Sequence, residues 1–242
     1  MGQSWFSWNG VDCRSMGVIM TAPAAIIRPE ERVQHIEIPG RAGDLTQTEG
    51  ENIFNSYIQT VSFTVRGGYR VRDVYKWLRG AGEVTFSGEP DRKQDARIIG
   101  AITLNRHSRN LDYYSGECQF YCQPLKKRLT APEISVSNGD TLRNDGDVMT
   151  RPRIRVKASS TTVTAGISGA GTPAVNTITL TGVTSGYWYV IDSNTLTVSD
   201  WERNTNHTDL SSGEFPVMGI GANVIALTGV SEAHVFVRER FL

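Results

Sequence analysis

The pattern of hydrophobic and polar residues along this 242-residue chain has a helical period in only one convincing place, residues 71–78. Apolar side chains recur there at spacings of three and four, and charged side chains take most of the remaining positions. The apolar face is Val71, Val74, Tyr75 and Leu78, with Trp77 beside it. Gly80 and Gly82 follow, and glycine accepts the left-handed conformation that ends helices. We therefore predict one helix, followed by a short strand and a charged turn at residues 87–92.

The rest of the first half has the pattern of β-strands. Residues 53–66 form the longest alternating run, in which one face is Tyr57, Gln59, Val61, Phe63 and Val65. Residues 32–39 alternate as cleanly, which predicts a strand with one buried face. Residues 5–12 predict an aromatic strand with an Asn9-Gly10 turn. Residues 96–104 and 113–121, joined by a polar loop at 105–112, predict an antiparallel hairpin arm.

The second half consists of short apolar segments separated by turn-forming residues. The predicted strands are residues 161–164, 177–180, 187–191, 195–198, 224–227 and 234–238. Six or more such strands at short spacing favour a β-sandwich. Residues 159–176, rich in Thr, Ser, Ala and Gly, are predicted to be a hairpin or loop. The predicted organisation is an N-terminal domain at 1–130, a linker leading into the second domain at 131–151, and a C-terminal domain at 152–242.

Composition restricts the functional classes. Lys and Arg number 25 and Asp and Glu number 25, so the net charge gives no general case for binding nucleic acid or an anionic membrane. The sequence has no run of 18 apolar residues and no basic-then-apolar N-terminal signal. We expect a soluble protein that is made in the cytoplasm and does not insert into membranes.

The three cysteines are Cys13, Cys118 and Cys122. Cys118 and Cys122 lie in one predicted strand, where a spacing of four residues separates them by roughly 13 Å, too far for a disulfide in a straight strand. A zinc site would need more ligands than this region offers, because His107 is the one nearby imidazole. Buried free thiols are predicted, as in a protein folded in a reducing compartment.

No enzymatic motif emerges from the sequence. Gly40 and Gly43 could suggest a phosphate-binding loop, but neither a Gly-Lys-Ser/Thr end nor a GxGxxG pattern is present, so a tight turn is predicted. None of the four histidines belongs to an HExxH or similar motif. Glu89, Asp91 and Arg92 indicate a turn with local ion pairs, although two carboxyls facing across a cleft can be far apart in sequence. We predict no catalytic, cofactor-binding or metal-binding residues.

Several sequence segments, in this order, resemble the distal tail protein family of siphovirus-like bacteriophages and prophages. The segments are NGVD, IPGRAGDLT, VYKWLRGAGEVTFSGEPDR, ARIIGAITLNR and ECQFYCQP in the first half, and those around residues 152–156, 189–193, 213–217 and 221–225 in the second. The resemblance implies a mainly β fold. Its N-terminal domain would be sandwich-like or barrel-like, with one helix and a long hairpin arm, and its C-terminal sandwich would be of the galectin or carbohydrate-binding-module type.

The resemblance also implies a function and partners. The family forms a homohexameric ring at the tail tip, so this chain would be a virion component of the baseplate. The ring would join the tail tube protein to a hub protein of the tail-associated lysin type, and to receptor-binding or accessory proteins. It would act in tail assembly and host attachment without catalysis.

Two sets of residues are candidates for binding. A ring needs a patch that meets a different patch on the next subunit, and Trp5, Trp8, Arg106 and Arg109 are the candidate contacts. The alternative for both tryptophans is the core. The second set concerns carbohydrate binding by the C-terminal domain, with Trp188, Trp201 and Asp200 as candidate glycan or partner contacts. Alternation places Tyr187 and Tyr189 opposite Trp188, so part of this aromatic cluster is expected to be core.

Overall fold

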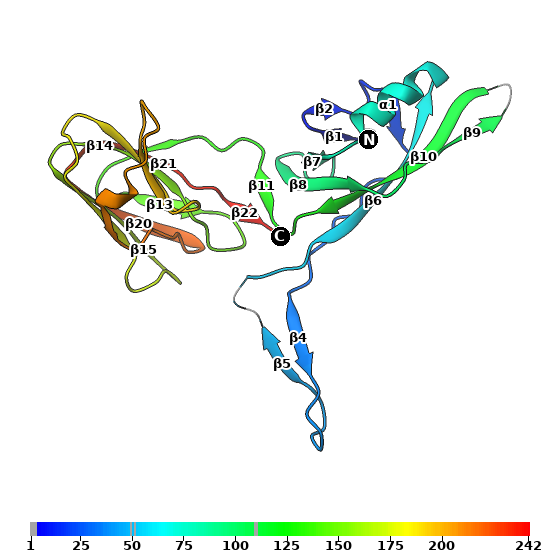
Figure 1. Cartoon of the computed structure of the whole chain (residues 1–242). Helices are drawn as coiled ribbons and strands as arrows, with labels where there is room; N and C mark the ends of the chain where they lie inside the picture. The colour runs from blue at the N-terminus through cyan, green and yellow to red at the C-terminus, as the bar shows by residue number, and fades with distance from the viewer. Residues whose placement is uncertain (1–3, 49, 51, 109–110) are drawn as a thin grey trace. The chain divides into compact units, whose positions relative to one another are not determined.

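The computed structural model describes residues 4–48, 50, 52–108 and 111–242, and the chain divides into two compact units. Unit 1 comprises residues 1–129 with Leu242, and unit 2 comprises residues 130–241. Both units consist mainly of β-strands, and the described residues include one α-helix (Figure 1). The predicted mainly β fold is confirmed. No helix in the described part is long and apolar enough to cross a membrane.

Unit 1 is built on one large antiparallel sheet with the strand order β2-β1-β7-β8-β10-β6-β3, to which β9 adds on β10 and β11 on β8. Its strands are β1 (Phe6–Trp8), β2 (Val11–Asp12), β3 (Val18–Met20), β6 (Tyr57–Arg66), β7 (Ala81–Phe86), β8 (Arg92–Ile99), β9 (Leu104–Ser108), β10 (Leu111–Cys122) and β11 (Lys126–Arg128). The five residues predicted to share one face of β6 include four buried ones, Gln59, Val61, Phe63 and Val65, and Tyr57 is partly buried. Buried apolar side chains on alternate residues give the sheet its core face.

The helix α1 (Val71–Trp77) follows a short 3-10 turn, η1 (Gly68–Arg70), and packs on the aromatic centre of the sheet. Val74 and Leu78 are buried as predicted, whereas Tyr75 is 41% exposed. The ring of Trp77 stacks on Phe6 at 5.5 Å, and its Nε1 donates to the backbone oxygen of Trp8 at 3.2 Å. One short helix therefore covers the sheet where its largest side chains lie.

Two local predictions in unit 1 are also confirmed. Asn9 and Gly10 both have positive φ, 51° and 77°, as a tight two-residue hairpin turn between β1 and β2 requires. Cys13, Cys118 and Cys122 are buried free thiols.

Strands β4 (Val33–Ile36) and β5 (Leu45–Thr48) form a two-stranded sheet of their own. The prediction that residues 32–39 bury one face is wrong, because Ile36 is 41% exposed and His35 on the opposite face is exposed too. Alternation shows which side chains share a face of a strand, but not whether anything covers that face. The predicted turn is confirmed, with positive φ at Gly40 (82°) and Gly43 (80°).

The predicted hairpin arm is confirmed, but its polar segment was assigned wrongly. Residues 105–108 continue the strand β9 and pair with β10, in a register that sets Gly116 opposite Leu104. The irregular connection lies earlier in the sequence, at residues 100–103, where it separates β8 from β9. An exposed strand needs no apolar alternation, so polarity alone did not reveal it.

Unit 2 contains two five-stranded antiparallel sheets, with orders β12-β21-β14-β17-β18 and β13-β20-β15-β16-β19. The strands are β12 (Ile134–Val136), β13 (Thr141–Asn144), β14 (Arg153–Ala158), β15 (Thr162–Gly169), β16 (Thr177–Thr181), β17 (Trp188–Asp192), β18 (Thr197–Asp200), β19 (Ser211–Gly213), β20 (Gly221–Thr228) and β21 (Val230–Phe236), with η2 (Thr208–Leu210) before β19 and β22 (Arg240–Phe241) last. One continuous core of twenty buried residues belongs to this unit. The segment 131–151 contributes an outer strand to each sheet, β12 and β13.

The hairpin that was one of the two alternatives predicted for 159–176 is present: residues 162–169 form β15, which pairs antiparallel with β16 across a connection at 170–176. β15 lies in the middle of its sheet, between β20 and β16, and buries Val163, Ala165 and Ile167. Gly166 pairs with Thr177 across β15 and β16, and a Cβ at Gly166 would collide with the Thr177 side chain. The small and polar residues of this segment therefore belong to a packed central strand and not to an exposed loop.

Candidate assembly and binding surfaces

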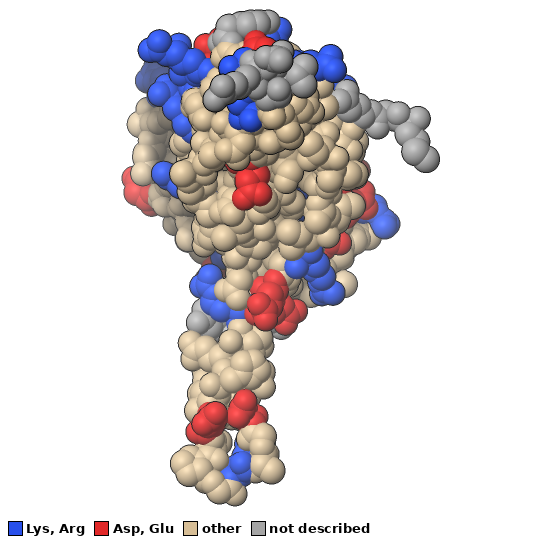
Figure 2. Space-filling view, turned by 90° about the vertical axis from the view of Figure 1, so that its right-hand side faces the viewer, with Lys and Arg blue, Asp and Glu red and all other residues tan. Residues whose placement is uncertain are grey.

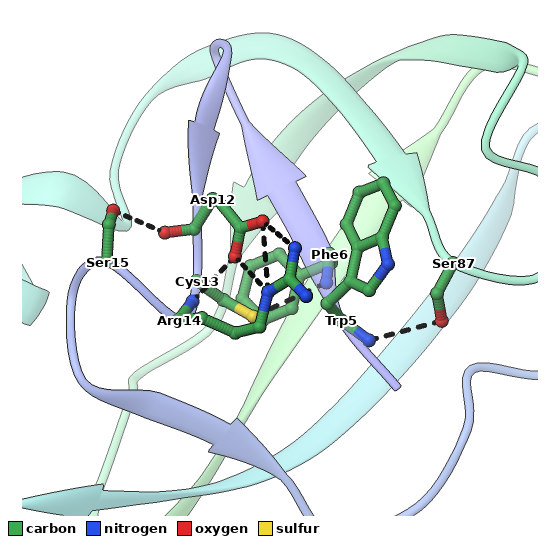
Figure 3. A network of polar contacts seen from close by, with 7 residues as sticks. All are labelled: Trp5, Phe6, Asp12, Cys13, Arg14, Ser15 and Ser87. Carbon is green, nitrogen blue, oxygen red and sulfur yellow. Dashed lines mark hydrogen bonds and ion pairs between the residues drawn. The ribbon is translucent and has the colours of Figure 1, made fainter. Parts of the chain in front are cut away.

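The aromatic N-terminal strand has one buried and one partly exposed tryptophan. Trp8 is fully buried, and its ring lies 5.5 Å from that of Phe120. Trp5 is partly buried at the start of the strand, where its N–H donates to Ser87 Oγ at 3.1 Å (Figure 3). The guanidinium of Arg14 lies over the Trp5 ring at 5.4 Å from its centroid. Trp5 therefore still offers surface to a neighbour, whereas Trp8 does not.

A short polar network fixes the Trp5 surface. Arg14 donates from Nε and Nη2 to the Asp12 carboxylate (Figure 3), and this hydrogen bonding lowers the pKa of Asp12. Next to it, Cys13 Sγ accepts from the Phe6 N–H at 3.4 Å, and burial raises the pKa of this thiol. The salt bridge holds Arg14 in the turn after β2, which keeps the cation over the indole.

Of the two predicted arginine candidates, Arg106 belongs to the hairpin arm. Arg106 is exposed on β9 and lies opposite Tyr114 in the ladder. Arg109 lies outside the described residues. Trp5 and Arg106 are therefore each exposed enough to contact another subunit.

The β4–β5 hairpin carries an apolar surface that the sequence interpretation missed. Ile36 lies opposite Leu45, and these two side chains are 41% and 42% exposed. Ile38, just beyond β4, is 39% exposed. The hairpin extends away from the large sheet of unit 1 and has few charged groups along its length (Figures 1 and 2). The signal in the sequence is a cleanly alternating strand that ends at a glycine-rich turn, a pattern that half-buried and fully exposed hairpins share.

In unit 2, the candidate aromatic residues Trp188 and Trp201 hold an arginine between them. The guanidinium of Arg155 lies 5.0 Å from the Trp188 ring centroid and 4.5 Å from that of Trp201. Arg155 also pairs with Glu133 at 3.2 Å. Trp201 is 47% exposed, but one region of its surface is occupied by this internal cation–π contact, which is worth about 0.5–2 kcal/mol.

A hollow of about 230 Å³ lies beside these aromatic residues. It is lined by Thr184, Tyr187, Trp188, Tyr189, Asp200, Glu202, Arg203 and His207. Tyr189 is buried and accepts from the Thr184 N–H at 3.0 Å, whereas Tyr187 is 47% exposed. The structure thus brings Trp188 and Asp200 together in this hollow and leaves Trp201 outside its lining.

Asp200 has a structural role in the wall of the hollow. Its carboxylate accepts hydrogen bonds from the Arg203 N–H and from His207 Nε2. Burial of the carboxyl acts to raise the pKa of Asp200, but the hydrogen bonds outweigh it and lower the pKa. The acceptor capacity of Asp200 is therefore largely used to hold residues 200–207 in place.

The charged turn that could have suggested a carboxylate pair is an ion-pair cluster, as predicted. Arg92 contacts Glu89 at 2.9 Å and Asp91 at 4.0 Å, and Lys126 contacts Glu89 at 2.6 Å. Among the described residues, no group of three or more His, Cys, Asp or Glu side chains could hold a metal ion.

No protein-family model and no curated protein matches this chain. Solved structures that are similar along all or nearly all of this chain include two from phage adsorption or baseplate assemblies. SPP1 Dit (gp 19.1), described as a paradigm of the hub adsorption apparatus in phages that infect Gram-positive bacteria, matches with a TM-score of 0.80 and 17% identity over 100% of both chains. A chain of the phage p2 baseplate, in its activated conformation with Sr, matches with a TM-score of 0.52 and 10% identity over 98% of this chain and 97% of that chain.

The fold is therefore that of a phage tail and baseplate protein. More particularly, it is the fold of a siphophage distal tail protein such as SPP1 Dit, as the sequence resemblance implied.

Proposed function

We propose that this chain is a structural, non-enzymatic component of a siphophage tail tip. Six copies form a ring through unit 1, and the ring joins the tail tube to the central hub and to receptor-binding or accessory proteins. The observation that carries this proposal is the likeness to SPP1 Dit over the full length of both chains, with a TM-score of 0.80. Unit 2 serves as the part that holds the accessory proteins.

The exposed hairpin supports assembly through unit 1. An isolated two-stranded hairpin is at best marginally stable in water, and this one exposes Ile36 and Leu45 side by side. Covering these side chains against another subunit would remove apolar surface from water at about 25 cal/mol per Å². A closed ring uses two different patches on each subunit, so the hairpin needs only a complementary surface on its neighbour. Trp5 and Arg106 are the further proposed contacts.

The solution mass tests the ring. Six copies of the 26.7 kDa chain give about 160 kDa, a mass readily separated from that of one copy by light scattering. Negative-stain images of the same sample would show a central hole. The double variant Ile36→Ser/Leu45→Ser is expected to lower the mass while leaving the circular-dichroism spectrum unchanged.

The matched control for this variant is Ile134→Ser in unit 2, since Ile134 is 40% exposed and Ile36 is 41% exposed. The control should retain the mass of the unmodified chain. A full-size ring in the hairpin variant would remove the hairpin from the proposed interface, and a monomer at every concentration, also when mixed with tail tube and hub proteins, would contradict the ring.

A second candidate function is carbohydrate binding by unit 2, favoured by the hollow beside Tyr187 and Trp188. Tyr187 is 47% exposed, so its ring can stack on a sugar, and Glu202 and Arg203 provide polar groups at the same place. A glycan array probed with the full chain tests this role. Binding that disappears in Tyr187→Ala would support it. Silence on the array, together with unchanged attachment to host cells by Trp201→Ala, would count against it.

A further inference from the structure

A second, larger hollow lies at one end of unit 2, away from every residue predicted to bind a ligand. Its volume is about 560 Å³, and it is lined by Arg151, Pro173, Val175, Asn176, Ser193, Leu196, Glu214, Phe215 and Val217. Val175 is 64% exposed and Leu196 is 50% exposed. The lining comes from four separate segments, before β14, before β16, between β17 and β18, and after β19. A water-exposed apolar concavity built in this way is typical of a binding surface.

The backbone is strained where Leu196 is displayed. Leu196 has a φ of +55° in the turn between β17 and β18, a conformation that costs a residue with a Cβ about 1–2 kcal/mol. Asp192 holds the turn by accepting from the N–H groups of Asn194 and Thr195. The fold thus carries both a strained backbone and an exposed leucine at the edge of the hollow, and such positions concentrate at functional sites.

An open strand edge runs into the same hollow. β19 lies at the edge of its sheet, and among the described strands it pairs with β16 alone. The ladder continues for one more bond, in which the Glu214 N–H donates to the Thr177 oxygen at 3.0 Å, and Glu214 and Phe215 then line the hollow. The other edge of β19 leaves backbone donors and acceptors for an added strand, and added strands gain specificity from pockets that receive alternate side chains.

The wall of the hollow favours an occupant with hydrogen-bonding groups. Ser193 is fully buried, and its Oγ has no hydrogen-bond partner in the described part of the chain. A buried hydroxyl without a partner costs about 1–3 kcal/mol. A peptide brings backbone groups as well as apolar side chains, whereas a purely apolar ligand brings none. Arg151 and Glu214 add one charge of each sign to the lining.

We infer that this end of unit 2 is a docking site for an extended segment of another protein. The segment adds to the open edge of β19 as a strand and places an apolar side chain in the hollow, against Val175 and Leu196. This inference rests on the proposed function, because it names how a tail-tip subunit would hold an accessory protein. The site is separate from the aromatic hollow considered for sugars, with which it shares no lining residue.

The probe is a library of random linear peptides of about twelve residues, long enough to span an added strand. It is selected on the immobilised full chain, and an enriched peptide is then measured by fluorescence anisotropy. We expect enriched peptides with apolar residues at alternate positions. Val175→Ser and Leu196→Asn should each weaken binding and raise the dissociation constant by roughly tenfold. N-methylation of alternate backbone amides in the peptide should abolish binding.

Val224→Ser is the matched control, since Val224 is an exposed valine of the same unit that does not line the hollow. It should leave the dissociation constant within a factor of about two. The inference would be overturned by failure to enrich any peptide, by equal binding to Val175→Ser and the unmodified chain, or by retained binding of the N-methylated peptide. A lower oligomer mass of Leu196→Asn would instead identify the hollow as a contact between copies and also overturn it.

The failure of this inference can be told apart from failure of the proposed ring. The Ile36→Ser/Leu45→Ser variant changes unit 1 alone, so it should lose the ring and still bind the selected peptide. The Val175→Ser variant should retain the ring and lose the peptide. A chain that never forms a ring but binds the peptide would remove the ring and leave the docking site in place.

Discussion

The guanidinium of Arg238 contacts both carboxylate oxygens of Asp192, with Nη1 and Nη2 each 2.6 Å from an oxygen. The same carboxylate accepts from the N–H groups of Asn194 and Thr195, so it fixes the turn that displays Leu196. Burial acts to raise the pKa of Asp192, but the hydrogen bonds and charge of Arg238, with the two backbone donors, lower it below its ordinary value. A bidentate pair of this kind is among the stronger polar contacts in proteins.

Asp192→Asn is expected to reduce the free energy of unfolding by about 1–3 kcal/mol at pH 7. Because the folded-state pKa lies below the unfolded value, ionised Asp192 contributes its stability above pH 4 and loses it as the pH falls through the folded-state pKa. The difference between the variant and the unmodified chain should therefore shrink in urea titrations as the pH falls below about 4. Asp209→Asn, at an exposed carboxylate, is the control. A difference independent of pH would contradict the assignment.

Leu196→Asn is expected to stabilise unit 2, because asparagine tolerates the left-handed conformation better than leucine. The free energy of unfolding should rise by about 0.5–1 kcal/mol in urea titrations. Leu196→Ala lacks the short polar side chain whose local hydrogen bonds let asparagine adopt this conformation, so it should bring no comparable gain. An equal gain in both variants would show that exposure of the leucine, and not its backbone conformation, is what costs stability.

Ile167→Ala tests the placement of residues 162–169 in the centre of a sheet. Ile167 is 4% exposed, so its truncation should cost about 2–4 kcal/mol of the free energy of unfolding. Val175→Ala lies in the same Thr- and Gly-rich segment but is 64% exposed, and it should change stability by less than about 0.5 kcal/mol. Similar small effects for both would mean that residues 162–169 form an exposed loop and not a buried strand.

The features that the sequence predicted correctly are those with a strong local signal. The alternation of β6 follows from its own residues, as does the Asn9-Gly10 turn, because period-two burial and positive φ are properties of short stretches. The helix was located by its period, yet Tyr75 on its apolar face is exposed. What covers a face depends on elements elsewhere in the chain.

The features that the sequence did not reveal depend on distant residues. Ile36 and Leu45 are exposed because no other described strand joins their hairpin, which no local pattern records. Ile167 is buried because its side chain packs in the core that the two sheets of unit 2 share. The docking hollow joins Arg151, Leu196 and Glu214, which are far apart in the sequence, so only the fold brings them together.

The two N-terminal tryptophans should respond differently to substitution. Trp8→Ala removes a fully buried indole and should lower the free energy of unfolding of unit 1 by about 3–5 kcal/mol. The variant should then fail to form the subunit ring because unit 1 unfolds. Trp5→Ser removes a partly exposed ring and one cation–π contact, at a cost of about 0.5–2 kcal/mol. A folded Trp5→Ser variant with a lower light-scattering mass would support Trp5 as a subunit contact. A full-size subunit ring in this variant would exclude Trp5 as a subunit contact.

The cysteines offer a measurement of core integrity. Burial raises the pKa of Cys118 and of Cys122 to about 12. At pH 8 the thiolate, which is the reactive form, would then be roughly one part in ten thousand of each thiol. The folded chain should resist a disulfide reagent for hours, and all three cysteines should react in urea. Ser185→Cys, at an exposed position, should add one fast-reacting thiol and serve as the control. Fast reaction of Cys118 or Cys122 in the folded chain would mean that β10 opens readily, and the sheet of unit 1 would then be too unstable to support a ring.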